Sequence, residues 1–290
     1  MDLSIAGLPV CIESADTAFF NKRFADYRRD DDRAPVMRMR TVVLDHIPTP
    51  QGELIRQVDR VSIVRLADGR MCRYGRSDGG VVYFAVFATP DYSDVELQLV
   101  SGRRHPQFTQ TDLEYVYTGS LFCDRLYALG GGVLHSSSLS YRGNGLAFSA
   151  DSGTGKSTHV GLWKQFFPDD VEIINDDKPA IMFDGDQPLL CGTPWSGKTA
   201  LNLNRQVPLR AIVFIERGTV NSIRRLDAMD SMYRLLGQIS RPYYDAALGE
   251  RAVDFAQRLY ESLPIYCLTC DISREAVDTV YNTIFLQEAE

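Results

Sequence analysis

The sequence predicts an α/β fold in two parts, a mostly β region over residues 1–110 and an α/β region over residues 111–290. Short apolar segments separated by Asp-Gly and Gly-Gly turns occupy the first third, which is typical of strands in a β-rich region. They are RTVVLDH near residue 40, VSIVRLA near 62, VVYFAVFA near 81 and DVELQLVS near 94. The remaining residues alternate apolar segments of strand length with segments of helical periodicity, which indicates an α/β arrangement.

The second region begins with a helix expected over residues 111–129, which a Thr or Asp cap opens and three glycines close. A strand over 133–141 and a turn at 142–144 follow. The later segments predict, in order, a hairpin of KPAIMF and PLLCG around Asp184-Gly185-Asp186, a strand LRAIVFIERG, helices DAMDSMYRLLGQIS and DAALGERAVDFAQRLYESL, a strand PIYCLTC and a helix SREAVDTVYNTIFLQ.

The composition is that of an ordinary globular chain. With 290 residues and 44% hydrophobic content, it can form one large core or two moderate ones. No apolar run approaches the roughly 20 residues needed to cross a bilayer. The first residues also lack the basic start and apolar stretch of a secretion signal, so we expect a cytoplasmic location and no membrane partner. The formal net charge of −7 disfavours nucleic acid as a partner.

The six cysteines are too few and too irregularly spaced for a disulfide framework in a chain of this length. Cys267 and Cys270 form a lone C-x-x-C inside an apolar segment, with no second pair and no nearby histidine to complete four zinc ligands. We therefore interpret both as buried side chains.

Two segments are similar to the glycine-rich loops that hold phosphate groups. The segment GTPWSGKT, from Gly192 to Thr199, satisfies the full pattern, whereas Ala150 replaces the opening glycine in ADSGTGKS. The segment with Ala150 lies between an apolar strand and a helical segment that stops at Pro168, while asparagines and Pro208 follow the other one. Because such a loop works between a strand and a helix, we expect the first to hold phosphates and the second to approach the same site.

The first loop offers the groups that a nucleoside triphosphate and its Mg²⁺ require. Four residues can turn their backbone N–H groups toward phosphate oxygens, beside the positive end of the helix dipole: Ser152, Gly153, Thr154 and Gly155. Lys156 would reach the β and γ phosphates, and the Ser157 hydroxyl would bind Mg²⁺.

Two adjacent acids, Asp176 and Asp177, end the strand that follows this helix. Consecutive side chains of a strand point in opposite directions, so one carboxylate can face the metal and the other an incoming hydroxyl. We assign Asp176 to Mg²⁺, directly or through water, and Asp177 to the hydroxyl as general base; the reverse assignment stays open.

Further candidate groups surround this pair. His135 lies one strand upstream and either pairs with Asp177 or a phosphate or has a structural role. Ser196 and Lys198, in the second loop, would bring a hydroxyl and a cation to the transferred phosphoryl group. Arg217, at the end of a predicted strand, would meet a phosphate or form a salt bridge.

Four motifs in order, LHSSS, FSADSGTGKSTH, INDDKPAI and GTPWSGKTALN, resemble those of the HPr kinase/phosphorylase-related group among the phosphoenolpyruvate carboxykinase-like P-loop proteins. The resemblance covers roughly residues 113–290. It implies a P-loop fold that binds ATP and Mg²⁺, with nucleotide-binding residues from Ser152 to Thr158. It also places the histidine of the family at His135 and the aspartate that activates a serine hydroxyl at Asp177.

The chain differs from the bifunctional members of that family, which carry a glycine-rich segment with an acid and an arginine where this chain has GTPWSGKTALN. It is more similar to stand-alone relatives that phosphorylate serine in a small peptide or a free small-molecule hydroxyl. We therefore expect a kinase whose acceptor is a peptide, protein or small-molecule hydroxyl, with recognition by residues 1–110. The resemblance also allows a homo-oligomer. Two alternatives are an ATP-binding module without catalysis and, less favoured in so short a chain, carboxykinase chemistry.

Overall fold

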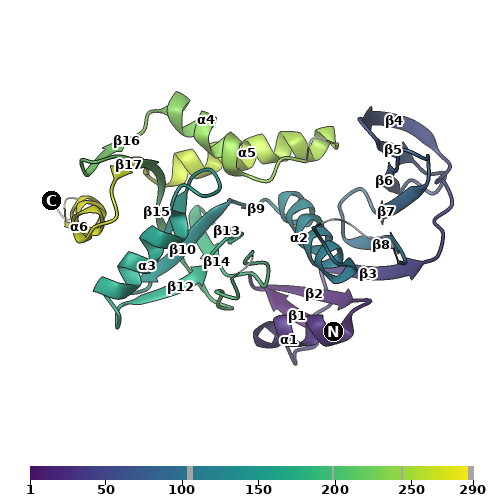
Figure 1. Cartoon of the computed structure of the whole chain (residues 1–290), viewed down its shortest axis with the longest axis horizontal. Coiled ribbons are helices and arrows are strands. Elements are labelled where there is room, and N and C mark those ends of the chain that lie inside the picture. The colour runs from purple at the N-terminus through teal and green to yellow at the C-terminus, as the bar shows by residue number, and fades with distance from the viewer. Residues whose placement is uncertain (103–106, 198, 243, 287–290) are drawn as a thin grey trace. The chain divides into compact units, whose positions relative to one another are not determined.

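The computed structural model describes residues 1–102, 107–197, 199–242 and 244–286, and it has a mixed α/β fold (Figure 1). Contacts divide the chain into two compact units. The first holds Met1–Leu129 and Pro242–Leu248, and the second holds Gly130–Arg241 and the residues from Gly249 onward. The contact division thus falls after helix α2 (Gln110–Ala128), whereas the sequence suggested a boundary before this helix.

The described residues of the first unit form an eight-stranded sheet in the order β1-β2-β3-β8-β7-β6-β5-β4. The pairs β2–β3 and β3–β8 are parallel, and the other neighbours are antiparallel. The four expected strands are present as β3, β5, β7 and β8, while four others were not anticipated. The bounds are β1 (Asp2–Ile5), β2 (Leu8–Glu13), β3 (Met37–Leu44), β4 (Glu53–Val58), β5 (Val61–Arg65), β6 (Met71–Arg76), β7 (Val82–Ala88) and β8 (Asp94–Val100).

The helices of the first unit are fixed by caps and by aromatic packing. The N-cap of α2 is Thr109, whose hydroxyl accepts the N–H of Asp112, while the Asp112 carboxylate accepts the N–H of Thr109. Asp16 caps α1 (Thr17–Arg23), and a short 3₁₀ turn (Ala25–Tyr27) follows it. The Phe20 and Phe24 rings stack with their centroids 5.0 Å apart in the buried interior.

A buried polar cluster lies inside the first unit. Asp124 of α2 is 2% exposed, and both of its carboxylate oxygens accept the Tyr244 hydroxyl, at 2.6 and 2.5 Å. The guanidinium of Arg73, on β6, lies 3.7 Å from the centre of the Tyr244 ring. Burial raises the pKa of Asp124 to about 6, although the Arg73 charge opposes the rise.

The described strands of the second unit form a nine-stranded mixed sheet. β10 pairs with β11 and β12 antiparallel; β15 continues the sheet, parallel to both β11 and β17, and its first residues pair with β14. The hairpin that the sequence predicts around Gly185 is present as β13 and β14. The bounds are β9 (Gly132–Val133), β10 (Ser136–Tyr141), β11 (Asn144–Ser149), β12 (Val171–Asn175), β13 (Ala180–Asp184), β14 (Gln187–Cys191), β15 (Gln206–Arg217), β16 (Ser222–Arg225) and β17 (Ile265–Cys270).

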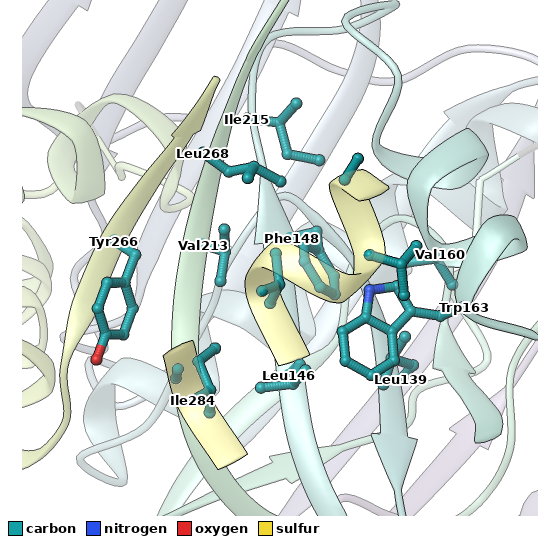
Figure 2. Packing of buried hydrophobic residues seen from close by; sticks show 14 of the residues in the cluster. Leu139, Leu146, Phe148, Val160, Trp163, Val213, Ile215, Tyr266, Leu268 and Ile284 are labelled. Carbon is teal, nitrogen blue, oxygen red and sulfur yellow. The ribbon is translucent and has the colours of Figure 1, made fainter. Parts of the chain in front are cut away.

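A hydrophobic core joins this sheet to α3 (Lys156–Phe166) and α6 (Arg274–Tyr281), as Figure 2 shows. Val160 and the fully buried Trp163 of α3 pack with Leu146 and Phe148 of β11. The side chains at i and i+3 of the helix share one face, and this explains why the apolar spacing predicted α3. The core therefore fixes the start of α3 close to the end of β11.

Three further segments complete the described helices: α4 (Ala228–Gln238), α5 (Ala246–Ser262) and a π-helical turn (Asn282–Leu286) that extends α6. Cys267 and Cys270 are buried on β17, in agreement with their interpretation as buried side chains. A bilayer could not be crossed by any helix in the described parts of the chain, because none combines sufficient length with sufficient apolar character.

Candidate active site

The loop between β11 and α3 has the backbone conformation that its glycines permit. Gly153 and Gly155 have φ values of +79° and +124°, which side-chain-bearing residues rarely adopt. A Cβ atom built on either glycine would meet nothing within 4 Å. Ala150 is not among the described non-glycine residues with positive φ, so alanine fits where the usual pattern has glycine. The loop is open on its outer side and does not depend on an opening glycine.

The start of α3 presents unpaired donors to this open loop. Gly155 is the N-cap residue and has no side chain to cap the helix. The first N–H groups of an α-helix have no partner within the helix and carry the positive end of its dipole. Ser157 and Thr158, in the first turn, are both exposed. An anion bound here would meet backbone N–H groups and two hydroxyl groups.

Two side chains hold the loop from outside. The Arg217 guanidinium donates to the Gly153 carbonyl at 2.5 Å and to the Thr154 carbonyl at 3.1 Å. The Gln238 amide donates to the Asp151 carboxylate at 2.8 Å. A peptide N–H points roughly opposite to the carbonyl of the same peptide unit. Because Arg217 binds the two carbonyls, the N–H groups of Thr154 and Gly155 face away from its guanidinium.

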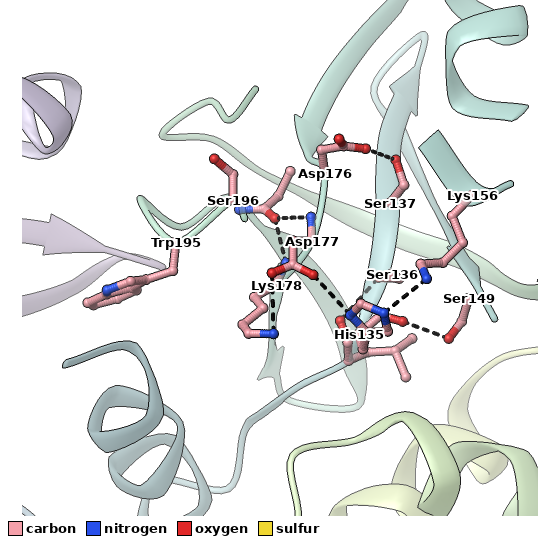
Figure 3. Close-up of polar contacts among 12 residues, drawn as sticks. His135, Ser136, Ser137, Ser149, Lys156, Asp176, Asp177, Lys178, Trp195 and Ser196 are labelled. Carbon is pink, nitrogen blue, oxygen red and sulfur yellow. Dashed lines mark hydrogen bonds and ion pairs between the residues drawn. The ribbon is translucent and has the colours of Figure 1, made fainter. Parts of the chain in front are cut away.

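Lys156 connects the loop with His135. Its ammonium donates to the carbonyls of Ala150 and Asp151 at 2.8 and 3.3 Å, and it lies 2.9 Å from Nε2 of His135 (Figure 3). Burial lowers the pKa of Lys156, and the neighbouring Asp177 and Asp151 oppose this effect. Since an ammonium group has no lone pair to accept with, His135 Nε2 is the acceptor, which places the imidazole proton on Nδ1.

Asp177 lies on the other side of the His135 ring. Its Oδ1 is 3.0 Å from His135 Nδ1, and its Oδ2 is 3.3 Å from the Lys178 ammonium. The Nδ1 donor is poorly aligned with Oδ1, so the contact is mainly electrostatic. Burial would raise the pKa of Asp177, but the contacts with His135 and Lys178 outweigh burial and hold it below its usual range. Asp177 is therefore ionised near neutral pH.

The turn that carries Asp177 is built by Asn175, which is fully buried at the end of β12. Its amide oxygen accepts the N–H groups of Asp177 and Lys178, at 2.9 and 2.7 Å. Its amide nitrogen donates to the carbonyl and hydroxyl oxygens of Thr193. Sequence reasoning missed both Asn175 and Thr193. The available signal was an asparagine directly before the acidic pair, since asparagine often bonds the backbone two residues onward.

Asp176 and Asp177 lie in the bend that follows β12, not in the strand itself, and their carboxylates contact different partners. Oδ1 of Asp176 accepts the Ser137 hydroxyl at 2.7 Å, and its Oδ2 accepts the Thr199 hydroxyl at 3.0 Å. Among the described residues, no three acidic, histidine or cysteine side chains are grouped closely enough to form a metal cage. Each oxygen of Asp176 retains a lone pair for a further ligand.

The second glycine-rich loop passes beside both aspartates without a helix after it. A Cβ atom at Gly197, where φ is +63°, would lie 3.1 Å from Cβ of Asp177. The buried Ser196 donates to the Thr199 carbonyl and accepts the Asn202 amide, so its hydroxyl serves the loop itself. Lys198 lies outside the described residues. The full sequence pattern is thus not in a strand-loop-helix context here.

Comparisons with known proteins give little beyond this geometry. No family model matches the sequence, and no curated protein matches it. Among solved structures, the chain is similar to the Hpr(Ser) kinase/phosphatase from Coxiella burnetii, with a TM-score of 0.31 and 10% identity over 54% of this chain and 98% of that chain. Such a low TM-score supports no inference about activity, so the chemistry must be argued from the side chains.

Proposed function

We propose that this chain is a phosphoenolpyruvate carboxykinase-like P-loop kinase that uses ATP and Mg²⁺ to phosphorylate a hydroxyl group. The preferred acceptor is a serine in a peptide or protein, and a free small-molecule hydroxyl is the alternative. The observation that carries the proposal is the line of contacts from Lys156 through His135 to Asp177, which starts at the open loop. It joins a phosphate-binding cation to an ionised carboxylate.

The residues of the loop fit a triphosphate. Gly153 and Gly155 leave space where side chains would otherwise intrude, and the start of α3 adds unpaired N–H groups. Lys156 now donates to loop carbonyls, so phosphate oxygens can replace these acceptors without burying an unpaired charge. The same side chain would neutralise charge on the β and γ phosphates.

The oxygen donors fit Mg²⁺. The exposed Ser157 hydroxyl and the Asp176 carboxylate would hold the ion, since Mg²⁺ commonly takes one or two protein ligands and completes its shell with water and phosphate oxygens. When bound, the ion would neutralise part of the phosphate charge. In this assignment Ser137 and Thr199 orient the carboxylate of Asp176.

Asp177 would act as the general base. Its carboxylate takes the proton of the acceptor hydroxyl as the hydroxyl oxygen forms its bond to the γ phosphorus and the bond from that phosphorus to the bridging oxygen breaks, which leaves ADP. His135 lies with Nδ1 3.0 Å from Asp177 Oδ1 and would stabilise the ionised carboxylate electrostatically. Asn175 fixes the backbone of the base through two N–H contacts. Recognition of the acceptor by the first unit, and any self-association, stay predictions.

The test is transfer of labelled γ-phosphate from ATP, with Mg²⁺, to peptide, protein and small-molecule acceptors and to water. We expect Asp177→Asn to retain ATP affinity within about 3-fold and to lower transfer by about 10²–10⁴-fold, the usual contribution of a general base. Lys156→Ala should lose both affinity and transfer. Asp186→Asn, in the β13–β14 turn, is the matched control and should behave like the unmodified chain.

Transfer retained by Asp177→Asn would overturn its assignment as base. A chain that binds ATP but transfers phosphate to no acceptor, not even slowly to water, would favour the binding module without catalysis. Mass spectrometry of the product distinguishes phosphoserine in a polypeptide from a phosphorylated small molecule.

A further inference from the structure

A large pocket of the second unit lies directly beside the phosphate loop. Its volume is about 830 Å³, and its walls are Asp151 and Thr154 of the loop, the end of β15 and one side of α4. Small-molecule sites commonly have volumes of roughly 300–1,000 Å³, so the size suits a nucleoside. His135, Lys156 and Asp177 are not among its lining residues. A ligand in this pocket can thus contact the loop without covering His135, Lys156 or Asp177, where the acceptor hydroxyl would bind.

The two side chains that shape the loop also line this pocket. Arg217 comes from the end of β15 and Gln238 from the end of α4, and each contacts the loop by a hydrogen bond. A group bound between β15 and α4 would therefore sit next to the residues that orient the loop. The pocket and the phosphate loop are continuous parts of one site.

The pocket has the mixed chemistry that a nucleoside requires. Phe214 and Ile215 supply a buried apolar wall. Tyr233 of α4 lines the pocket although its side chain is 81% exposed, so its ring offers a face for a planar base. Arg234 and Glu216 form an ion pair at 2.6 Å and give fixed polar groups at the wall. An apolar wall, an accessible aromatic face and a few placed polar groups are typical of such sites.

We propose that this pocket binds the nucleoside part of the triphosphate, with the base against Tyr233 and the triphosphate directed into the loop. The inference depends on the proposed function and extends it, because it assigns the part of the nucleotide that the loop does not hold. It also sets the direction of the ligand, with the nucleoside between β15 and α4 and the γ phosphate toward Asp177.

Gly237 gives a direct test. It lies in α4 and lines the pocket, and a Cβ atom added there meets nothing within 4 Å. Leucine at this position would extend from the pocket wall into open space, and leucine favours helix over glycine. The helix should therefore remain intact while the nucleoside loses its space. Gly161→Leu is the matched control, since Gly161 is an exposed position of α3 with equally open surroundings.

The experiment measures the affinity of the full chain for ATP and for inorganic tripolyphosphate, each with Mg²⁺, by calorimetry. We expect Gly237→Leu to weaken ATP binding at least 10-fold and to leave tripolyphosphate binding within about 2-fold, because the added side chain occupies space on the α4 wall that the nucleoside would use and the phosphate groups would not. Gly161→Leu should change neither. Tyr233→Ala should weaken ATP binding about 5-fold and Tyr233→Phe should not, since the ring face, worth about 1 kcal/mol, is retained.

The possible failures are distinguishable. Equal weakening of both ligands by Gly237→Leu, or no weakening of either, would overturn the nucleoside assignment while the phosphate loop stands. An unmodified chain that binds neither ATP nor tripolyphosphate would overturn the proposed function, and the nucleoside assignment with it. If Gly237→Leu lowers the melting temperature, the comparison of Tyr233→Ala with Tyr233→Phe decides between these outcomes.

Discussion

Each unit of the molecule contains a cluster of charged side chains, and the two clusters differ in access. In the first unit, Asp124 is 2% exposed and is enclosed with Arg73 and Tyr244. In the second unit, the side chains of Asp177 and His135 are 22% and 30% exposed, beside an open loop. Both clusters place a carboxylate near a nitrogen-containing side chain, Arg73 in the first and His135 in the second. Of the two carboxylates, only that of Asp177 keeps a substantial part of its side chain exposed.

This difference is the basis for assigning a structural role to the first cluster and for proposing a chemical role for the second. The enclosed Asp124 carboxylate shares the one proton of the Tyr244 hydroxyl between its two oxygens and so ties the Pro242–Leu248 segment to α2 within the first unit. Lys156, in contrast, donates to two backbone carbonyls, which phosphate oxygens would replace as acceptors under the proposed function. The pKa values agree with this reading, because burial raises that of Asp124 whereas contacts lower that of Asp177. The following predictions test the contrast.

The largest expected difference is in stability. Asp124→Ala should lower the free energy of unfolding of the first unit by about 3–5 kcal/mol, because it leaves Arg73 without its counter-charge and Tyr244 without its acceptor. Asp177→Ala should lower the free energy of unfolding of the second unit by no more than about 1 kcal/mol, since its partners His135 and Lys178 are partly exposed to water. Hydrogen exchange of α2 and α3 amides reports the two units separately. If Asp124→Ala and Asp177→Ala lowered the free energy of unfolding by similar amounts, the two clusters would not differ in the way described.

The pH dependence of stability should also differ. The pKa of Asp124 rises from 3.8 to about 6 on folding, so between these values the folded chain binds a proton that the unfolded chain releases. Stability of the first unit should therefore fall as pH rises from about 4 to 6, by about 3 kcal/mol. In the second unit, burial lowers the pKa of His159 from 6.5 to about 4. Its contribution to the free energy of unfolding therefore rises with pH over this range.

The measurement compares urea unfolding of the unmodified chain and Asp124→Asn across pH 4–7. Subtraction of the two curves removes His159 and all other shared groups. The difference should slope downward to about pH 6 and then level off. A flat difference would show that Asp124 does not titrate in this range.

The smallest effect is expected at Arg217, which shapes the loop from outside. Arg217→Ala removes two hydrogen bonds to loop carbonyls and should raise KM for ATP about 10-fold, equivalent to roughly 1.4 kcal/mol, with little change in kcat. Arg225→Ala, at an exposed position of β16, is the control and should leave KM unchanged. A fall in kcat at constant KM would instead place Arg217 at the transferred phosphoryl group.

The fold was predictable where the pattern is local. Apolar spacing predicted α3 and its stop before Pro168, and the turn around Gly185 predicted the β13–β14 hairpin. β4 was missed because its residues are largely exposed and show no apolar alternation. The strand expected over 133–141 is interrupted at His135, because Leu134 instead bridges Ile239.

The sequence named several residues that the structure brings together, and their roles stay predictions. Spacing placed Lys156 and Asp177 at the ends of neighbouring elements, and the structure brings both to His135. Both glycine-rich loops carry suitable residues, and the sequence distinguished them by the helical segment after the first and the asparagines and Pro208 after the second. The absence of a described helix directly after Thr199 separates them in the structure.

The sequence by itself determined the elements around the first glycine-rich loop and which residues were proposed to bind phosphate, because periodicity and turn chemistry act between near neighbours in the chain. Only the tertiary structure decided which charges are enclosed and which are accessible. Asp124 meets Tyr244, Asp151 meets Gln238 and Gly153 meets Arg217 across 120, 87 and 64 positions of the chain. Such contacts depend on packing of the whole unit, and packing sets the exposure and pKa of each group.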